Sequence, residues 1–261
     1  MSEMRPAIGP EIKRIVRQRC GFGCIICGSP IIDYDHIEEY HIVKKHEAEN
    51  ITLLCPNHHR EKTLGRLPKE KVIKANENPY NLIKKEKGKS ELYFYGNEIS
   101  IVIGNITLKT KDTGDGGFLV PLIVYDEAPM FFKLNNDDIS VNIRLKDKED
   151  NIILLIEESE LIVTNGVWDF EYVGKVLTIR EKARKIFVEI EFLPPNTIYL
   201  KRTNIFCNGG QLSINQEKGI TFNGKDLNMA FNRGVVNCQY GFIIHEEIRD
   251  YHGAFFLQVG K

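Results

Sequence analysis

The sequence contains no long apolar run. None of its hydrophobic stretches approaches the about 20 residues that a helix needs to cross a bilayer, and the N-terminus (MSEMRPAIGPEIKR) lacks the apolar core of a signal peptide. A composition of 42% apolar and 27% charged residues excludes a mostly disordered, collagen-like or low-complexity chain. We therefore expect a soluble, cytoplasmic protein without a membrane segment, folded into one or two domains over 261 residues.

The sequence also has little net charge, −1 at neutral pH, which argues against a chain that binds nucleic acid over its whole length. The charge is unevenly distributed. Residues 1–89 carry 17 Lys and Arg against 12 Asp and Glu, whereas the rest of the chain carries 18 against 24. A basic N-terminal part suits a phosphate-facing module joined to a part with another task, and a solvated basic face is the alternative explanation.

Apolar and polar residues alternate in the C-terminal two thirds of the sequence, as at 99–103, 141–146 and 188–192. This period of two is typical of strands with one wet face. Turn signals separate such segments, at Thr113–Gly117, Asn135–Asn136, Pro194–Asn196, Asn208–Gly210 and Asn223–Gly224. We expect an all-β domain of eight or more strands, a sandwich by default and a β-roll or solenoid as the alternative. No strict repeat supports a regular solenoid.

The first 75 residues have a different pattern. It predicts a helix over 11–19, a strand through Ile31 and Ile32 that ends at His36, a strand over 51–54, and helices over 56–64 and 69–76. A polar, basic stretch follows. The predicted fold class is α+β, with a small N-terminal domain (1–75), a linker (76–90) and a larger all-β domain (91–261).

Four of the six cysteines lie within 36 residues, without the export signal that accompanies disulfide frameworks. Cys24-Ile25-Ile26-Cys27 is a C-x2-C pair, and Cys55-Pro56-Asn57-His58 is a C-x2-H pair. This spacing predicts a tetrahedral zinc site, and because four protein ligands fill the zinc shell, the ion is structural. Cys20, Cys207 and Cys238 are interpreted as packing residues.

A second polar group accompanies the zinc pattern. Asp35 and His36 end the first predicted strand, Asn50 begins the second, and His59 follows the last zinc ligand. Neighbouring helix residues point about 100° apart, so His58 can face the zinc while His59 faces elsewhere. If the hairpin folds onto the helix, a carboxylate and an imidazole can hold a second divalent cation, and a neutral His beside them can take a proton from water. These residue types indicate phosphodiester hydrolysis.

At these residues the sequence resembles the HNH nucleases, a family with a ββα-metal core. The resemblance is carried by RQRCGFGCIICG (17–28), DYDHI (33–37) and ENITLLCPNHHREKT (49–63). It implies that Asp35 and His59 bind the catalytic cation, Mg²⁺ or Mn²⁺. It also implies that His36 is the general base, that Asn50 orients this base or its loop, and that the zinc knuckles are scaffold.

The resemblance implies a reaction in which His36 deprotonates a water that attacks phosphorus in line, leaving a 5′-phosphate and a 3′-hydroxyl. It further implies contacts mostly to the DNA backbone. Arg60, Lys62 and Arg66 are candidates for phosphate contacts, with a solvated face as the alternative for each.

The sequence leaves the ligands at the start of the 56–64 helix open. The family more often has Cys where His58 stands, so His58 and His59 can exchange roles, and Asn57 can supply an amide oxygen to the catalytic cation. His41 and His46 are expected to be exposed loop residues.

The function expected from the sequence is a metal-dependent DNA endonuclease, and analogy places it in bacterial restriction or antiphage defence. A zinc-stabilised nucleic-acid-binding module without cleavage is the alternative. The all-β domain is expected to serve oligomerisation or recognition, through a second copy, a protein partner or a small molecule. Within it, Trp168, Tyr172 and His245 are candidate ligand contacts, with core packing as the alternative.

Overall fold

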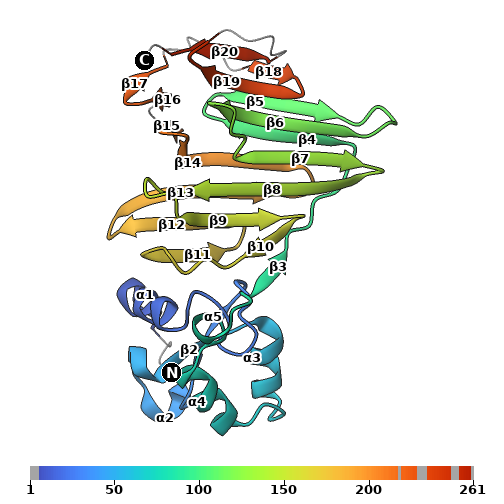
Figure 1. Ribbon diagram of the computed structural model, residues 1–261. Helices are drawn as coiled ribbons and strands as arrows, with labels where there is room; N and C mark the ends of the chain where they lie inside the picture. The colour runs from blue at the N-terminus through green and yellow to red at the C-terminus, as the bar shows by residue number, and fades with distance from the viewer. Residues whose placement is uncertain (1–5, 217–218, 228–233, 248–252, 260–261) are drawn as a thin grey trace.

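The computed structural model describes residues 6–216, 219–227, 234–247 and 253–259. A helical N-terminal part, up to residue 88, precedes a large all-β part that contains two sheets (Figure 1). The predicted α+β fold class is therefore confirmed. Within the described residues, no helix is both long and apolar enough to cross a membrane.

The N-terminal part consists of a two-stranded sheet surrounded by short helices. Its elements are α1 (Pro10–Arg19), β1 (Asp33–His36), α2 (Tyr40–Val43), the 3₁₀ helix η1 (Ala48–Asn50), β2 (Ile51–Leu54), α3 (Pro56–Thr63), α4 (Lys69–Glu77) and α5 (Tyr80–Ile83). The helices predicted over 11–19, 56–64 and 69–76 are confirmed. The first strand begins only at Asp33, so Ile31 and Ile32 precede it instead of forming it.

Local sequence explains these elements. Pro10 and Pro56 stand in the first turn of α1 and α3, where a missing N–H has no intrahelical partner to lose. All four residues of β2 are buried, which is why its sequence is continuously apolar apart from Thr52. β1 and β2 pair antiparallel with Asp35 opposite Thr52. The hairpin thereby presents β1 beside the start of α3.

Within the described residues, one sheet of the all-β part has eight strands, in the spatial order β20-β19-β6-β7-β8-β9-β10-β3. Their bounds are β3 (Lys89–Glu91), β6 (Gly117–Val124), β7 (Met130–Asn135), β8 (Asp138–Lys146), β9 (Ile152–Glu157), β10 (Glu160–Ile162), β19 (Tyr240–His245) and β20 (Phe255–Gln258).

The other sheet has ten strands in the part of the chain that the structure describes. Seven of them follow the order β11-β12-β13-β14-β15-β16-β17, while β4 pairs with β14 and with β5, which in turn pairs with β18. Their bounds are β4 (Glu98–Ile103), β5 (Ile106–Lys111), β11 (Asp169–Val173), β12 (Val176–Lys182), β13 (Lys185–Leu193), β14 (Thr197–Cys207), β15 (Gly210–Asn215), β16 (Gly219–Phe222), β17 (Lys225–Asp226) and β18 (Gly234–Asn237).

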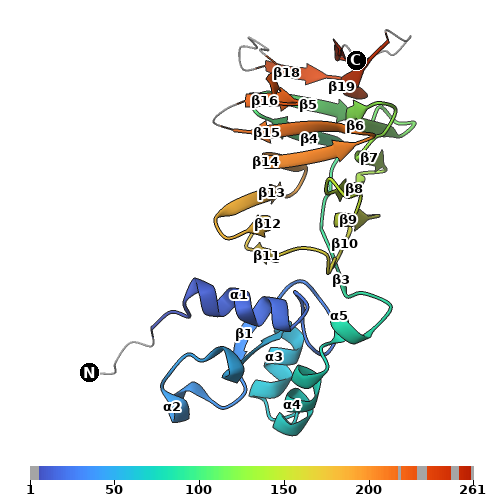
Figure 2. The same cartoon turned by 60° about the vertical axis from the view of Figure 1, so that its left-hand side comes forward.

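The two sheets form two layers around a shared apolar core, as Figure 2 shows, so the arrangement is the predicted sandwich. Phe132 and Val141 of one sheet and Leu177 and Ile190 of the other belong to this core. Among the strands described, β14 is parallel to β4, β18 to β5, and β19 to both β6 and β20. Turn signals cannot predict such pairs because they mark antiparallel hairpins.

Helix α1 connects the two parts of the molecule at the edge strand β11. The Arg17 guanidinium forms two hydrogen bonds to the Asp169 carboxylate, 2.8 and 2.7 Å long, and both side chains are buried. Glu171 adds an ion pair at 2.9 Å. On the same helix, the Arg14 guanidinium lies 4.7 Å from the centre of the Trp168 ring. This face of α1 is therefore covered by the all-β part.

The stretch predicted as a linker, 76–90, contains α5 and the fully buried Asn81. The Asn81 amide donates to the carbonyls of Gly21 (3.0 Å) and Gly28 (2.9 Å), and its oxygen accepts from the Gly88 N–H (2.8 Å). A Cβ at Gly28 would lie 2.3 Å from the Asn81 oxygen, so only glycine permits this approach. The segment that leads into the all-β part is thereby attached to the turn that contains Cys24 and Cys27.

Candidate active site

Three thiols and one imidazole converge where β2 meets α3. Their four ligand atoms, from Cys24, Cys27, Cys55 and His58, all lie within 4.8 Å of one another. The Cys27 and Cys55 sulfurs are 3.8 Å apart, and His58 Nδ1 lies 3.2 Å from the Cys55 sulfur and 3.4 Å from that of Cys24. A tetrahedron with metal bonds of about 2.3 Å to sulfur and 2.0 Å to nitrogen has edges of about 3.8 and 3.5 Å. The Cys₃His cluster therefore fits a zinc ion.

The three thiols of the cluster differ in acidity, and burial raises the pKa of Cys55. A hydrogen bond from the Cys27 thiol lowers the pKa of Cys24 to about 5, and the same bond raises the pKa of Cys27. Burial likewise raises the pKa of Cys207 to about 12, so its thiol stays protonated, as expected of a packing residue. Across the residues that the structure describes, the Cys₃His cluster is the one group of three or more His, Cys, Asp or Glu that is close enough to share a metal ion.

His59 points away from the Cys₃His cluster and toward β1. Its Nδ1 lies 3.2 Å from an Asp33 oxygen, and its Nε2 lies 3.6 Å from an Asp35 oxygen. Asp33 and Asp35 are two residues apart on a strand, so their side chains share one face. Asp35 and His59 are donors of the types that suit Mg²⁺ or Mn²⁺. Asp33 lies at the other nitrogen of His59, so the three side chains do not close around one ion.

Lys62 lies one turn after His59 on α3 and points into the same region. Its ammonium group is 2.6 Å from Asp35 Oδ2 and donates a 2.6 Å hydrogen bond to the His36 carbonyl. The ammonium neutralises part of the carboxylate charge and ties the end of β1 to α3. Arg60 and Arg66, the other predicted phosphate contacts, are exposed.

His36 is buried, and a second histidine contacts its ring. His36 Nε2 is 3.1 Å from His46 Nδ1, and His46 Nε2 is 2.8 Å from the carbonyl oxygen of Pro6. A carbonyl only accepts, so neutral His46 carries its proton on Nε2 and accepts at Nδ1. The His36 proton must then be on Nε2. This hydrogen-bond pattern assigns the basic lone pair of neutral His36 to Nδ1.

Asn50 holds the loop that follows His36. Its side-chain oxygen accepts from the Glu38 N–H at 2.7 Å, and its amide group donates to the Glu38 carbonyl at 2.9 Å. The Ile37 N–H also donates to the Asn50 carbonyl at 2.8 Å. These paired hydrogen bonds resemble those between two β-strands, and they fix the backbone directly after β1.

The remaining sequence candidates lie elsewhere. Asn57 is exposed on α3, and His41 is exposed and forms an ion pair with Glu39. In the all-β part, Tyr172 packs edge-on against Phe192, and His245 lies 3.5 Å from an Asp126 oxygen.

Sequence reasoning gave no role to Asp33 or His46. The strand period of two was a signal for Asp33, because it places residues 33 and 35 on one face. No local pattern points to His46, which reaches His36 across a loop.

Comparison with known families agrees with this geometry. Residues 24–64 match the family described as HNH endonuclease. This segment contains the Cys₃His cluster, β1, β2 and α3. The match falls on the segment whose motifs resemble that family. Comparisons with curated proteins and with solved structures gave no match.

Proposed function

We propose that this protein is a metal-dependent endonuclease that hydrolyses DNA phosphodiester bonds and leaves a 5′-phosphate and a 3′-hydroxyl. The contacts of His59 with Asp33 and Asp35 beside the Cys₃His cluster carry the proposal, while the His36 ring lies against His46. In this scheme Cys24, Cys27, Cys55 and His58 hold a structural zinc, and Asp35 and His59 hold Mg²⁺ or Mn²⁺.

His36 is the general base of the proposed reaction. Neutral His36 would take a proton from a water, and the water oxygen would attack phosphorus in line. His46 keeps the His36 proton on Nε2 throughout, while Lys62 holds the His36 carbonyl and Asn50 holds Glu38, two residues further along the chain. The bound cation would supply charge neutralisation at the phosphate and at the departing 3′-oxygen.

We also propose how the chain is divided between tasks. Residues 1–75 form the nuclease domain, 76–90 join it to the remainder, and 91–261 form an accessory domain for recognition or oligomerisation. Exposed Arg60 and Arg66 suit contacts to DNA phosphates, which favour weak sequence preference. The biological setting that we propose, bacterial restriction or antiphage defence, rests on analogy with enzymes that carry this core.

The alternative is a zinc-stabilised module that binds nucleic acid without cutting it. The Cys₃His cluster is compatible with this function as well. A binding module, however, needs neither the two carboxylates beside His59 nor the hydrogen bonds that join His36, His46 and the Pro6 carbonyl.

Cleavage of supercoiled plasmid separates the two functions. We expect the purified protein to cut plasmid with Mg²⁺ or Mn²⁺ and to lose this activity when EDTA is added. His36→Ala should bind DNA as the wild type does and keep its zinc, yet lose cleavage by about 100-fold or more, the range for a missing general base.

His41→Ala is the matched control, because His41 is an exposed histidine of the neighbouring α2. It should cut at the wild-type rate. A wild-type protein that binds plasmid but is inert with both metals, or a His36→Ala variant that cuts normally, would favour the binding module.

A further inference from the structure

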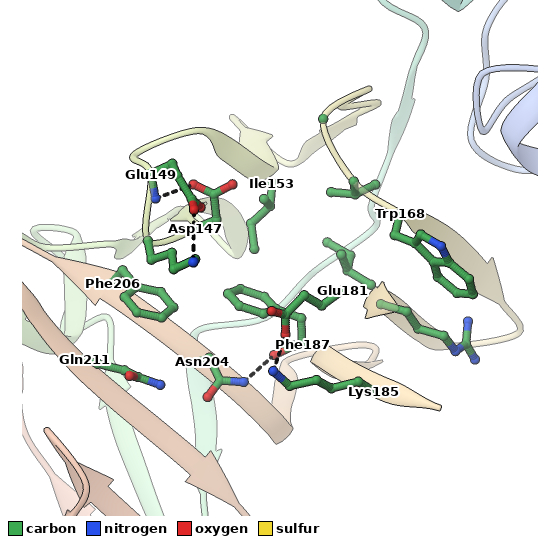
Figure 3. Close-up of a pocket in the computed structure, with 15 residues that line it drawn as sticks. Asp147, Glu149, Ile153, Trp168, Glu181, Lys185, Phe187, Asn204, Phe206 and Gln211 are labelled. Carbon is green, nitrogen blue, oxygen red and sulfur yellow. Dashed lines mark hydrogen bonds and ion pairs between the residues drawn. The ribbon is translucent and has the colours of Figure 1, made fainter. Parts of the chain in front are cut away.

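A cavity of about 520 Å³ opens between the two sheets of the all-β part, at the end nearest the N-terminal part (Figure 3). Small-molecule sites typically have volumes of about 300–1,000 Å³. The walls come from the β8–β9 loop, the segment before β11, and strands β12 to β15. The lining includes Trp168, Phe187, Asn204, Phe206 and Gln211, together with charged residues at the rim.

One wall of the cavity is aromatic. The Phe187 and Phe206 rings are stacked nearly parallel, 12° apart, with centres separated by 5.9 Å. Both are half-buried, and the buried Ile153 and Ile179 complete the apolar lining. Trp168 lies at the opposite end (Figure 3). A planar aromatic ring makes the most extensive contact with such a wall.

Two side-chain amides stand beside the aromatic wall. Asn204 donates to the Phe187 carbonyl at 3.1 Å and accepts from Ser213 at 2.7 Å, and Gln211 donates to the same Ser213 hydroxyl at 3.3 Å. Each bond uses one of two N–H donors per amide, so both amides keep capacity for a ligand. Amides with both donors and acceptors match the edge of a heterocyclic base.

The charges of the lining cancel. Three carboxylates face three cations, and most of these groups are already paired. Lys185 lies 2.6 Å from Glu181, Lys148 lies 3.2 Å from Glu149, and Arg180 lies 3.0 Å from Asp169. The Asp147 carboxylate accepts from the backbone of its own loop. The lining therefore carries no net charge, which favours a neutral ligand.

We propose that this cavity is a binding site for a neutral nucleoside. Its base stacks on Phe187 and Phe206, and the base edge pairs with the amides of Asn204 and Gln211. The sugar hydroxyls face the polar β8–β9 loop at the rim.

The same cavity borders the contact with the N-terminal part. The Arg14 guanidinium of α1 makes a cation–π contact with the Trp168 ring, and the Trp168 carbonyl accepts a hydrogen bond from Gln18. Arg180 shares the Asp169 carboxylate with Arg17. Because Trp168 lines the same cavity, a ligand that reaches it would change the surroundings of α1. An effect of the nucleoside on DNA cleavage follows from this contact and rests on the proposed nuclease function.

Binding is tested on the full chain without any nuclease assay. Trp168 is the one tryptophan of the sequence, so intrinsic fluorescence reports directly on the cavity. We expect titration with adenosine, guanosine, cytidine and uridine to give a saturable change with at least one, with a dissociation constant below about 1 mM. Calorimetry with the same four nucleosides detects a ligand that leaves the Trp168 emission unchanged.

Gln211→Leu should weaken this binding at least tenfold, whereas Gln216→Leu, an exposed glutamine outside the cavity, should leave it unchanged. The proposal is overturned if neither method detects any of the four nucleosides, or if both variants bind as the wild type does. Tighter binding of adenosine 5′-monophosphate than of adenosine would overturn the neutral ligand class.

The link to cleavage is measured separately, as the plasmid-cutting rate with and without the bound nucleoside. We expect a change of at least threefold in the wild type and none in Gln211→Leu. If the protein does not cut DNA at all, the fluorescence and calorimetry still decide whether the cavity binds a nucleoside.

Discussion

At the scale of single residues, the hydrogen bonds of His36 decide which of its nitrogens can accept a proton. His46 holds the His36 proton on Nε2 because its own proton is committed to the Pro6 carbonyl. Without such a partner, a neutral imidazole can carry its proton on either nitrogen, and one of the two tautomers has no lone pair at Nδ1. His46 is therefore a positioning residue in the proposed reaction.

Replacement of His46 should separate this role from mere packing. We expect His46→Ala to lower the rate of plasmid cleavage by about 10- to 100-fold, the effect typical of a lost outer-shell partner. His46→Gln should restore most of the rate, because the glutamine oxygen accepts the same hydrogen bond. ¹⁵N shifts of the His36 ring should indicate the Nε2–H form in the wild type and His46→Gln, and a mixture in His46→Ala. Equal rates in all three proteins would contradict the role.

At the scale of secondary-structure elements, α1 serves both parts of the molecule. Val16 belongs to the core of the N-terminal part, while Arg17, the next residue, reaches Asp169 of β11. The pair is buried and bidentate, and removal of one partner leaves the other charge without full compensation.

We therefore expect Arg17→Ala to destabilise the protein by about 3 kcal/mol, the lower end for a broken buried pair because Arg180 still contacts Asp169. Arg14→Ala on the same helix should cost about 1 kcal/mol or less, since Arg14 makes a cation–π contact and a surface ion pair. Denaturant unfolding monitored by fluorescence of Trp168 measures both. Similar losses of unfolding free energy in the two variants would show that the buried Arg17–Asp169 pair contributes no more than a surface contact.

At the scale of the whole molecule, the two parts depend on different forces. The N-terminal part has a small apolar cluster around Cys24, Leu53, Leu54 and Cys55, directly beside the Cys₃His cluster. The all-β part has a much larger apolar core shared by two sheets. A small core rarely supports folding alone, and structural zinc commonly supplies the missing free energy.

Zinc removal should consequently unfold one part before the other. We expect one zinc per chain by elemental analysis. Stripping the zinc with a strong chelator should abolish most of the helical circular dichroism while the β signal and a high-temperature transition persist. Cys27→Ser should behave like the stripped protein, and Cys238→Ser, which changes a cysteine outside the cluster, like the untreated one. A stripped protein with unchanged dichroism and melting would contradict a structural role for zinc.

The sequence by itself determined the local features of this protein. The C-x2-C and C-x2-H spacings place ligands within one turn or one helix start, and alternation with turn signals predicts individual strands, because both depend on neighbours a few residues apart. Only the tertiary structure decided which distant residues meet: Asp33 with His59, His36 with His46, Arg17 with Asp169, and the parallel strand pairs. Those contacts arise when separately formed elements pack, and the sequence near either partner carries no pattern that identifies the other.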